Sequence, residues 1–214
     1  KDTIVVWASD NGPQTHQGPG FPYGPAGDTG PFRNEFPSAW EGAIRTVGMI
    51  RWPGHVAAGR VSNEIVSMLD FYRTFANVAG ASDRVPSDRA IDSIDQTDFL
   101  LGKQPKSNRE SVMYFYGPDL LAMKWRNYKI HLVTREPSRG DVRNPGQGLI
   151  TGTQTTPTYP LAFDIANDPK ELWNVAASST WLGEVFGRIQ VAYARSIRQF
   201  PNVEPGAEGP KAPQ

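Results

Sequence analysis

The stretch Thr3-Ile4-Val5-Val6-Trp7-Ala8-Ser9-Asp10-Asn11-Gly12 contains the pattern that decides the fold. Its first six residues are apolar and rich in strand formers, and the Asp-Asn-Gly that follows is typical of a turn. We expect residues 3–8 to form a buried parallel strand that ends at the turn. In open α/β sheets, ligands bind just beyond the carboxyl ends of such strands, so the turn is a candidate site.

Asp10 and Asn11 place a carboxylate and a carboxamide side by side at this strand end. Their oxygens are hard donors of the kind that calcium and magnesium prefer. Gly12 allows the backbone to turn sharply after them. The alternative is an ordinary turn in which both side chains bond only to nearby backbone groups. The stretch by itself leaves both interpretations open.

The segments that follow carry a more specific pattern. Residues 30–45 read GPFRNEFPSAWEGAIR, residues 50–56 read IRWPGHV, residues 58–64 read AGRVSNE, and Asp70 comes next. Their order and spacing resemble the C-terminal part of the sulfatase family, within the alkaline-phosphatase-like superfamily. The resemblance extends from about Thr3 to about Ala177. It implies an α/β fold: the C-terminal part of a large sulfatase domain, followed by a small antiparallel sheet with a packed C-terminal helix.

The resemblance also implies a metal site. In sulfatases, an Asp-Asn pair after a strand binds a divalent cation beside a formylglycine nucleophile, so Asp10 and Asn11 are the expected ligands. The cation is usually calcium, and magnesium is the other possibility. Formylglycine is made from Cys or Ser in a Cys/Ser-x-Pro-x-Arg motif, and this chain lacks the motif. We therefore expect the nucleophile and the other ligands upstream, in the N-terminal part of the same protein, and no turnover by these residues alone.

Position 36 departs from the family pattern. Many sulfatases have Gly-x-x-Arg-x-x-Lys here, and the lysine contacts the sulfate, whereas this chain has Gly30, Arg33 and Phe36. A phenyl ring cannot neutralise an oxyanion. Three explanations stay open: another cation replaces the lysine, the substrate pocket is different, or activity has been lost. We interpret Arg33 as a structural ion-pair partner.

His16 lies in the Gly/Pro-rich stretch 12–30, directly after the Asp-Asn pair. A stretch of this length without a periodic pattern is often functional. An imidazole there is a candidate substrate-binding group for a sulfate or leaving-group oxygen, and the alternative is a surface polar residue. His131 lies in an expected strand, and we interpret it as structural.

Composition excludes several function classes. The 22 Lys and Arg balance the 22 Asp and Glu, and there is no basic stripe of the kind that binds nucleic acid. The sequence has no run of 18 apolar residues, which is about the shortest stretch that spans a membrane as a helix. The 21 Gly and 19 Pro predict long loops. The family resemblance suggests a periplasmic or secreted protein.

We divide the chain into three parts. Residues 1–108 are assigned to the C-terminal part of the large α/β domain, residues 109–200 to the small antiparallel-sheet subdomain with its helix, and residues 201–214 to a flexible tail. In the first part, Asp70 is the expected N-cap of a helix that ends at Gly80.

The small subdomain has clear local patterns. We expect an irregular excursion over 134–158. Apolar residues at helical spacing predict a helix over 181–200. Residues 125–127 are expected to form a hairpin turn. The expected strands lie within 112–116, 120–123, 128–133 and 161–165.

The function that the resemblance implies is hydrolysis of a sulfate ester, on a small molecule or a glycan. One alternative is a phosphodiesterase or phosphonate hydrolase of the same superfamily, and relative rates on aryl sulfate and aryl phosphate esters separate the two. The other is a non-catalytic sulfatase-like binding protein. An upstream segment without Cys/Ser-x-Pro-x-Arg would favour that alternative.

Overall fold

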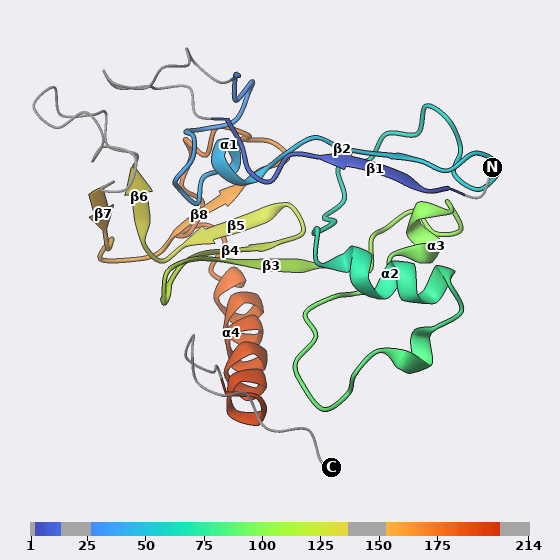
Figure 1. Cartoon of the computed structure of the whole chain (residues 1–214). Coiled ribbons are helices and arrows are strands. Elements are labelled where there is room, and N and C mark those ends of the chain that lie inside the picture. The colour runs from blue at the N-terminus through green and yellow to red at the C-terminus, as the bar shows by residue number, and fades with distance from the viewer. Residues whose placement is uncertain (1–2, 14–26, 137–152, 202–214) are drawn as a thin grey trace, which may run out of the picture.

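The centre of the structure, a computed structural model that describes residues 3–13, 27–136 and 153–201, is a four-stranded antiparallel sheet. The sheet has the order β3-β4-β5-β8 and packs with the C-terminal helix α4 (Leu182–Gln199), as Figure 1 shows. The expected antiparallel sheet and C-terminal helix are confirmed. The strands are β3 (Ser111–Tyr116), β4 (Asp119–Trp125), β5 (Tyr128–His131) and β8 (Leu161–Asp164).

Tight turns join the first three strands. Gly117, with φ 57°, turns β3 into β4, and glycine adopts this left-handed conformation without steric cost. Arg126 and Asn127 join β4 to β5, whose ends pair as Trp125 with Tyr128. Arg126 has φ 50°, and its N–H donates to the carbonyl oxygen of Glu110 at 2.8 Å. The hairpin expected from residues 125–127 is therefore present.

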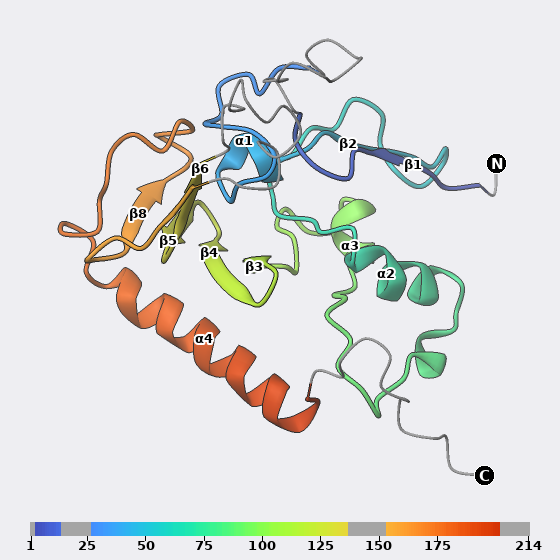
Figure 2. The ribbon, with the colours of Figure 1, turned by 60° about the vertical axis from the view of Figure 1, so that its left-hand side comes forward.

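The two faces of this sheet differ in chemistry. On one face, Met123 and Ala162 form an apolar cluster with Leu182 and Phe186 of α4. Burying a side chain of the size of Phe186 contributes about 1.5–3 kcal/mol. The opposite face carries Lys124, Lys129 and His131, which meet carboxylates instead. Figures 1 and 2 place α4 on one side of the sheet and the short helix α1 (Glu41–Ile44) on the other.

The first strand does not pair as expected. β1 (Val5–Ala8) forms an antiparallel ribbon with β2 (Gly48–Arg51), so the expectation of a buried parallel strand is wrong for the described residues. Val5 and Trp7 are 49% and 56% exposed. An apolar run indicates that a strand can be buried. Whether it is buried depends on which other segments pack against it.

Helix α2 (Asp70–Val78) begins one residue earlier than the expected cap implies. Leu69 is at the N-cap position, and no side chain caps the helix, so the N-cap role of Asp70 is wrong. Two short helices follow, η1 (Ser82–Arg84) and α3 (Thr97–Leu100).

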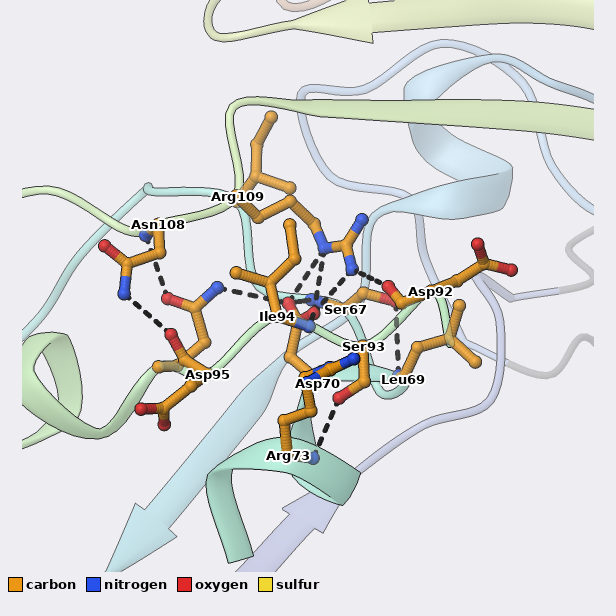
Figure 3. Close-up of polar contacts among 12 residues, drawn as sticks. Ser67, Leu69, Asp70, Arg73, Asp92, Ser93, Ile94, Asp95, Asn108 and Arg109 are labelled. Atoms are coloured by element: carbon orange, nitrogen blue, oxygen red, sulfur yellow. Dashed lines mark hydrogen bonds and ion pairs between the residues drawn. The ribbon is translucent and has the colours of Figure 1, made fainter. Parts of the chain in front are cut away.

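The Asp70 carboxylate is instead the centre of a buried polar cluster (Figure 3). It accepts the N–H groups of Ser67 and Ile94, each at 2.9 Å, and the Nε of Arg109 at 2.9 Å. Gln96 Nε2 also donates to it, at 3.3 Å. The carboxylate oxygens that would cap the helix therefore accept hydrogen bonds from Arg109 and from the backbone N–H groups of Ser67 and Ile94 instead.

The expected excursion over 134–158 contains a small ribbon. β6 (Thr134–Glu136) pairs antiparallel with β7 (Thr153–Thr155), so the segment is not irregular at its ends. Residues 137–152 lie outside the described part, as do residues 202–214 of the expected tail. The division of the chain at residue 108 stays a prediction. Across the described ranges, no helix has the length and apolarity to cross a membrane.

Asp70→Ala is expected to lower the free energy of unfolding by about 3–5 kcal/mol, because it leaves Arg109, whose side chain is only 10% exposed, without its counter-charge. Urea denaturation measures the change. The control is Asp88→Ala, which breaks an ion pair to Arg89 whose side chains are 68% and 66% exposed. This control is expected to leave the free energy of unfolding almost unchanged, because solvent screens an exposed ion pair. A similarly small change for both variants would contradict the prediction.

Candidate functional site

The Asp10-Asn11 turn is held by short local hydrogen bonds. Asn11 N–H donates to Asp10 Oδ1 at 2.9 Å, and Asn11 Nδ2 donates to the carbonyl oxygen of Gly12 at 2.7 Å. Ser9 Oγ donates to the carbonyl oxygen of Asn11 at 2.9 Å. These are bonds of the Asx-turn alternative. Among the described residues, Asp10 Oδ2 and Asn11 Oδ1 accept no hydrogen bond, so one oxygen of each side chain remains for a cation.

Two glycines fix this turn against α1. Gly12 N–H donates to the carbonyl oxygen of Ala43 at 2.7 Å, and Gly42 N–H donates to the carbonyl oxygen of Arg33 at 2.8 Å. A Cβ on Gly12 would collide with the carbonyl oxygen of Gly42, and a Cβ on Gly42 would collide with that of Asn34. Three backbone segments therefore approach closely only because these two positions lack side chains.

Glu41, between Trp40 and Gly42, joins α1 to the charged face of the sheet. Its Oε2 lies 2.7 Å from Lys124 Nζ, and its Oε1 lies 3.1 Å from Lys129 Nζ. Its backbone N–H donates to Glu171 Oε2 at 2.8 Å. Glu171 Oε1 in turn lies 2.7 Å from His131 Nε2 and 3.6 Å from Lys129 Nζ. We call these five residues, Glu41, Lys124, Lys129, His131 and Glu171, the carboxylate network.

Burial and charge act in opposite directions on these groups. Burial by itself would raise the pKa of Glu41, but the ammonium groups of Lys129 and Lys124 lower it to about 2. Burial lowers the pKa of Lys124, and Glu41 opposes this shift. Burial also lowers the pKa of His131 below its usual range, although the hydrogen bond to Glu171 acts in the other direction. His131 is therefore a neutral structural group at neutral pH.

Arg33 has the structural role expected of it. Its Nη1 donates to the carbonyl oxygen of Glu171 at 3.0 Å, and its Nη2 lies 3.4 Å from Glu136 Oε1. Its guanidinium also lies 3.7 Å from the centre of the Trp40 ring. His16 lies outside the described residues, so its expected contact with substrate stays a prediction.

Sequence reasoning did not find Glu171 or Lys129 as partners of Glu41. One signal was present in the segment Tyr128-Lys129-Ile130-His131, where polar residues alternate with apolar ones. Such alternation gives a strand one polar face, but it does not show whether that face is buried. Burial of both polar side chains of this strand depends on Glu41 and Glu171, which are distant in the sequence.

A pocket of about 170 Å³ opens beside the turn. Phe36, the position at which the family pattern has lysine, lines this pocket together with Asn11. Arg135 of β6 lines it as well. The remaining lining comes from residues 37–39, 43–44, 114–116 and 121.

The donors of the turn fit part of a cation site. Asp10 and Asn11 offer hard oxygens, and calcium takes about six to eight such ligands. Throughout the part of the chain that the structure describes, no three His, Cys, Asp or Glu side chains gather into a group that could hold a metal ion. A site built on Asp10 and Asn11 therefore needs further ligands.

Two family models match consecutive parts of the chain. A sequence model described as sulfatase matches residues 1–81, and a second model, described as the C-terminal region of aryl-sulfatase, matches residues 107–208. The two matches are consecutive and do not overlap.

Individual relatives show the same likeness. The chain is 33% identical over 198 residues to N-acetylgalactosamine-6-sulfatase of Canis lupus familiaris, covering 88% of this chain and 36% of the relative. It is 31% identical over 180 residues to arylsulfatase A of Homo sapiens, covering 82% of this chain and 34% of that relative. The crystal structure of PsFucS1 sulfatase from Pseudoalteromonas sp. matches 94% of this chain and 38% of its own, with a TM-score of 0.78 and 29% identity. The chain thus spans about a third of the length of these curated relatives.

The depressed pKa of Glu41 predicts a loss of stability in acid. Its folded pKa of about 2 lies below the ordinary 4.5, so the contribution is present above about pH 4.5 and is lost as pH falls toward 2. Between pH 5 and pH 3, the wild type is expected to lose about 2 kcal/mol more unfolding free energy than Glu41→Gln. Urea denaturation at each pH measures this difference.

Glu184→Gln is the matched control, because Glu184 is 70% exposed on α4. This control is expected to follow the wild type between pH 5 and pH 3. The prediction would be wrong if Glu41→Gln lost as much stability as the wild type over the same range.

Proposed function

The chain belongs to the sulfatase family, and on that premise we propose that it forms the C-terminal portion of an enzyme that hydrolyses sulfate esters. The observation that carries the proposal is the Asp10-Asn11 turn. Each side chain keeps one oxygen free of hydrogen bonds among the described residues, and Asn11 lines a pocket. Such a pair suits a hard cation that neutralises a sulfate oxyanion.

The proposed cofactor is calcium, with magnesium as the other candidate. When bound, the cation offsets negative charge on the sulfate oxygens, and a formylglycine upstream supplies the attacking hydroxyl. Asp10 and Asn11 would hold the cation from this side, and further ligands would come from the N-terminal part of the same protein. The two glycines keep the turn in place, because Gly12 and Gly42 allow it to pack directly on α1.

The N-terminal part is also the proposed partner for the exposed ribbon. Val5 and Trp7 of β1, Met49 of β2 and the adjacent Val47 are each about half exposed or more. Apolar surface of this kind gains about 25 cal/mol for each Å² that a partner removes from water. An upstream segment that packs here would bury these side chains and bring its own ligands toward Asp10. The proposed substrate is a sulfate ester on a small molecule or glycan.

The complete gene product is expected to hydrolyse 4-nitrophenyl sulfate, and removal of metal with EDTA is expected to abolish turnover until calcium is added back. Asp10→Ala is expected to lower kcat/KM by about 100-fold or more, because a lost metal ligand weakens both the cation site and its geometry. Calcium affinity, measured by calorimetry, is expected to fall in the same variant.

Asp83→Ala, in η1, is the control and is expected to leave kcat/KM and calcium affinity unchanged. Turnover that survives both EDTA and Asp10→Ala would contradict the proposed metal role. Faster hydrolysis of 4-nitrophenyl phosphate than of the sulfate would instead favour a phosphoric ester hydrolase of the same superfamily.

A further inference from the structure

Glu171 is a fully buried residue that contacts two segments close to the candidate metal turn. One of its carboxylate oxygens, Oε2, accepts the backbone N–H of Glu41, the first residue of α1, at 2.8 Å. Its carbonyl oxygen accepts Nη1 of Arg33 at 3.0 Å. Its φ of 51° lies in the left-handed region, which a non-glycine residue keeps only when its surroundings hold it there. These contacts therefore keep Glu171 in one conformation.

The Asp10-Asn11 turn packs on the same two segments. Gly12 N–H donates to the carbonyl oxygen of Ala43 in α1 at 2.7 Å, and Gly42 N–H donates to the carbonyl oxygen of Arg33 at 2.8 Å. The helix α1 and the segment before it therefore support the turn together. A side chain that binds both segments sets the position of the turn.

His131 orients the Glu171 carboxylate. Its Nε2 lies 2.7 Å from Glu171 Oε1, and its ring packs on that of Trp40, which precedes α1, with the ring centres 4.1 Å apart. An ionised carboxylate only accepts hydrogen bonds, so Nε2 carries the proton that joins the two groups. The ring of Phe163, on β8, packs edge-on with a distance of 5.9 Å between the centres. The imidazole is therefore fixed between α1, β8 and Glu171.

The second ring nitrogen makes the charge state of His131 important. Among the described residues, Nδ1 of this buried ring has no hydrogen-bond partner. In the neutral ring, whose proton is on Nε2, Nδ1 is only an unused acceptor. A second proton would make it a buried, charged donor without an acceptor, which costs far more. The buried position of the ring therefore favours the neutral imidazole.

The groups around the ring favour the neutral form as well. Burial lowers the pKa of His131, and the hydrogen bond to Glu171 opposes this shift. The positive charges of Lys129 and Arg33 lower the pKa further. Glu41 adds no free counter-charge, since each of its carboxylate oxygens is paired with a lysine ammonium group. A second proton on the ring therefore favours movement of the imidazole toward water and away from α1.

We propose that neutral His131 is a positioning residue for the Asp10-Asn11 turn, and that a second proton on its ring releases α1 and the turn together. The imidazole orients Glu171, Glu171 binds α1, and α1 supports the turn. The inference rests on the function proposed above, because the turn is the proposed metal site, and it deepens that function by giving the site a pH dependence. The metal then binds more weakly in mild acid.

Hydrogen exchange of the Gly12 amide tests this inference in the complete gene product without metal or turnover. The hydrogen bond to Ala43 protects this N–H while the turn packs on α1, and mass spectrometry with fragmentation follows its exchange. His131→Leu removes the donor to Glu171 and is expected to raise the Gly12 exchange rate about 10- to 100-fold, the range of a lost hydrogen bond to a charged group. His131→Gln keeps a neutral donor and is expected to change the rate less.

The pH dependence separates a positioning role from packing alone. Because the folded pKa is lowered, the contribution of His131 is present above the ordinary pKa of 6.5 and is lost as pH falls from there through the lowered value. Wild-type Gly12 exchange, corrected for the intrinsic rate, is expected to rise by as much as about 10-fold between pH 7.5 and pH 5.5, the limit for one histidine. Carboxylates, lysine and arginine ordinarily titrate outside this range. His131→Gln does not titrate and is expected to keep its rate.

Two controls exclude other causes of faster exchange. His55→Gln changes the histidine that stacks on Trp52 after β2, and it is expected to keep the wild-type pH profile. The amide of Ile94, which donates to Asp70 Oδ1 at 2.9 Å, reports opening elsewhere in the molecule. Its protection is expected to stay constant between pH 7.5 and pH 5.5.

Three results would overturn the inference. The first is an unchanged Gly12 rate in folded His131→Leu. The second is an equal rise of the rate in acid for the wild type and His131→Gln. The third is a wild-type rate that does not rise between pH 7.5 and pH 5.5, and this result needs no variant, so the inference stays testable even if a replacement of His131 prevents folding.

Calcium affinity, measured by calorimetry at the same two pH values, extends the test to the metal site. The wild type is expected to bind calcium more weakly at pH 5.5, and His131→Gln is expected to lose less affinity. An equal loss in both proteins would overturn the inference. If the wild type binds no calcium at either pH, the proposed metal role is contradicted, and the Gly12 exchange by itself decides whether His131 positions the turn.

Discussion

The pairing of Glu41 with Lys124 and Lys129 is the interaction on which the rest of the structure depends. A sheet face that carries two ammonium groups cannot be buried against apolar side chains, because an unpaired buried charge is costly. Glu41 neutralises both lysines, and Glu171 adds a second carboxylate to the network. This pairing fixes α1 on the sheet. Because Gly42 and Ala43 follow Glu41 directly, it also fixes the backbone against which Gly12 packs.

The two faces of the sheet therefore have different roles. Its face toward α4 is apolar and contributes hydrophobic stabilisation through Met123, Leu182 and Phe186. Its face toward α1 is polar and, through α1, positions the Asp10-Asn11 turn, which lies more than 100 residues earlier in the sequence. The pocket lies where α1 and the segment before it meet β3 and β4 and the adjoining β6. A substitution on the α4 face is thus expected to act through stability, and one on the α1 face through the site.

Local patterns were sufficient to predict the sheet strands, the Arg126-Asn127 turn and α4, because alternation, turn residues and helical spacing are properties of single segments. Pairing between distant segments was not predictable in this way. Asp70 looked like a helix cap, but Arg109 lies 39 residues further on and binds its carboxylate. In the same way, Arg135 shares a cavity with Phe36 only because β6 is placed beside β4, which no single segment indicates.

That this chain forms one wall of a sulfatase active site is tested most directly by peptide mapping of the complete gene product with mass spectrometry. We expect an upstream peptide that carries Cys/Ser-x-Pro-x-Arg and in which the Cys or Ser has the mass of formylglycine. Such a peptide would supply the nucleophile that the described turn and pocket lack. A gene product without that motif, or with the motif unmodified in the active preparation, would contradict the proposed chemistry.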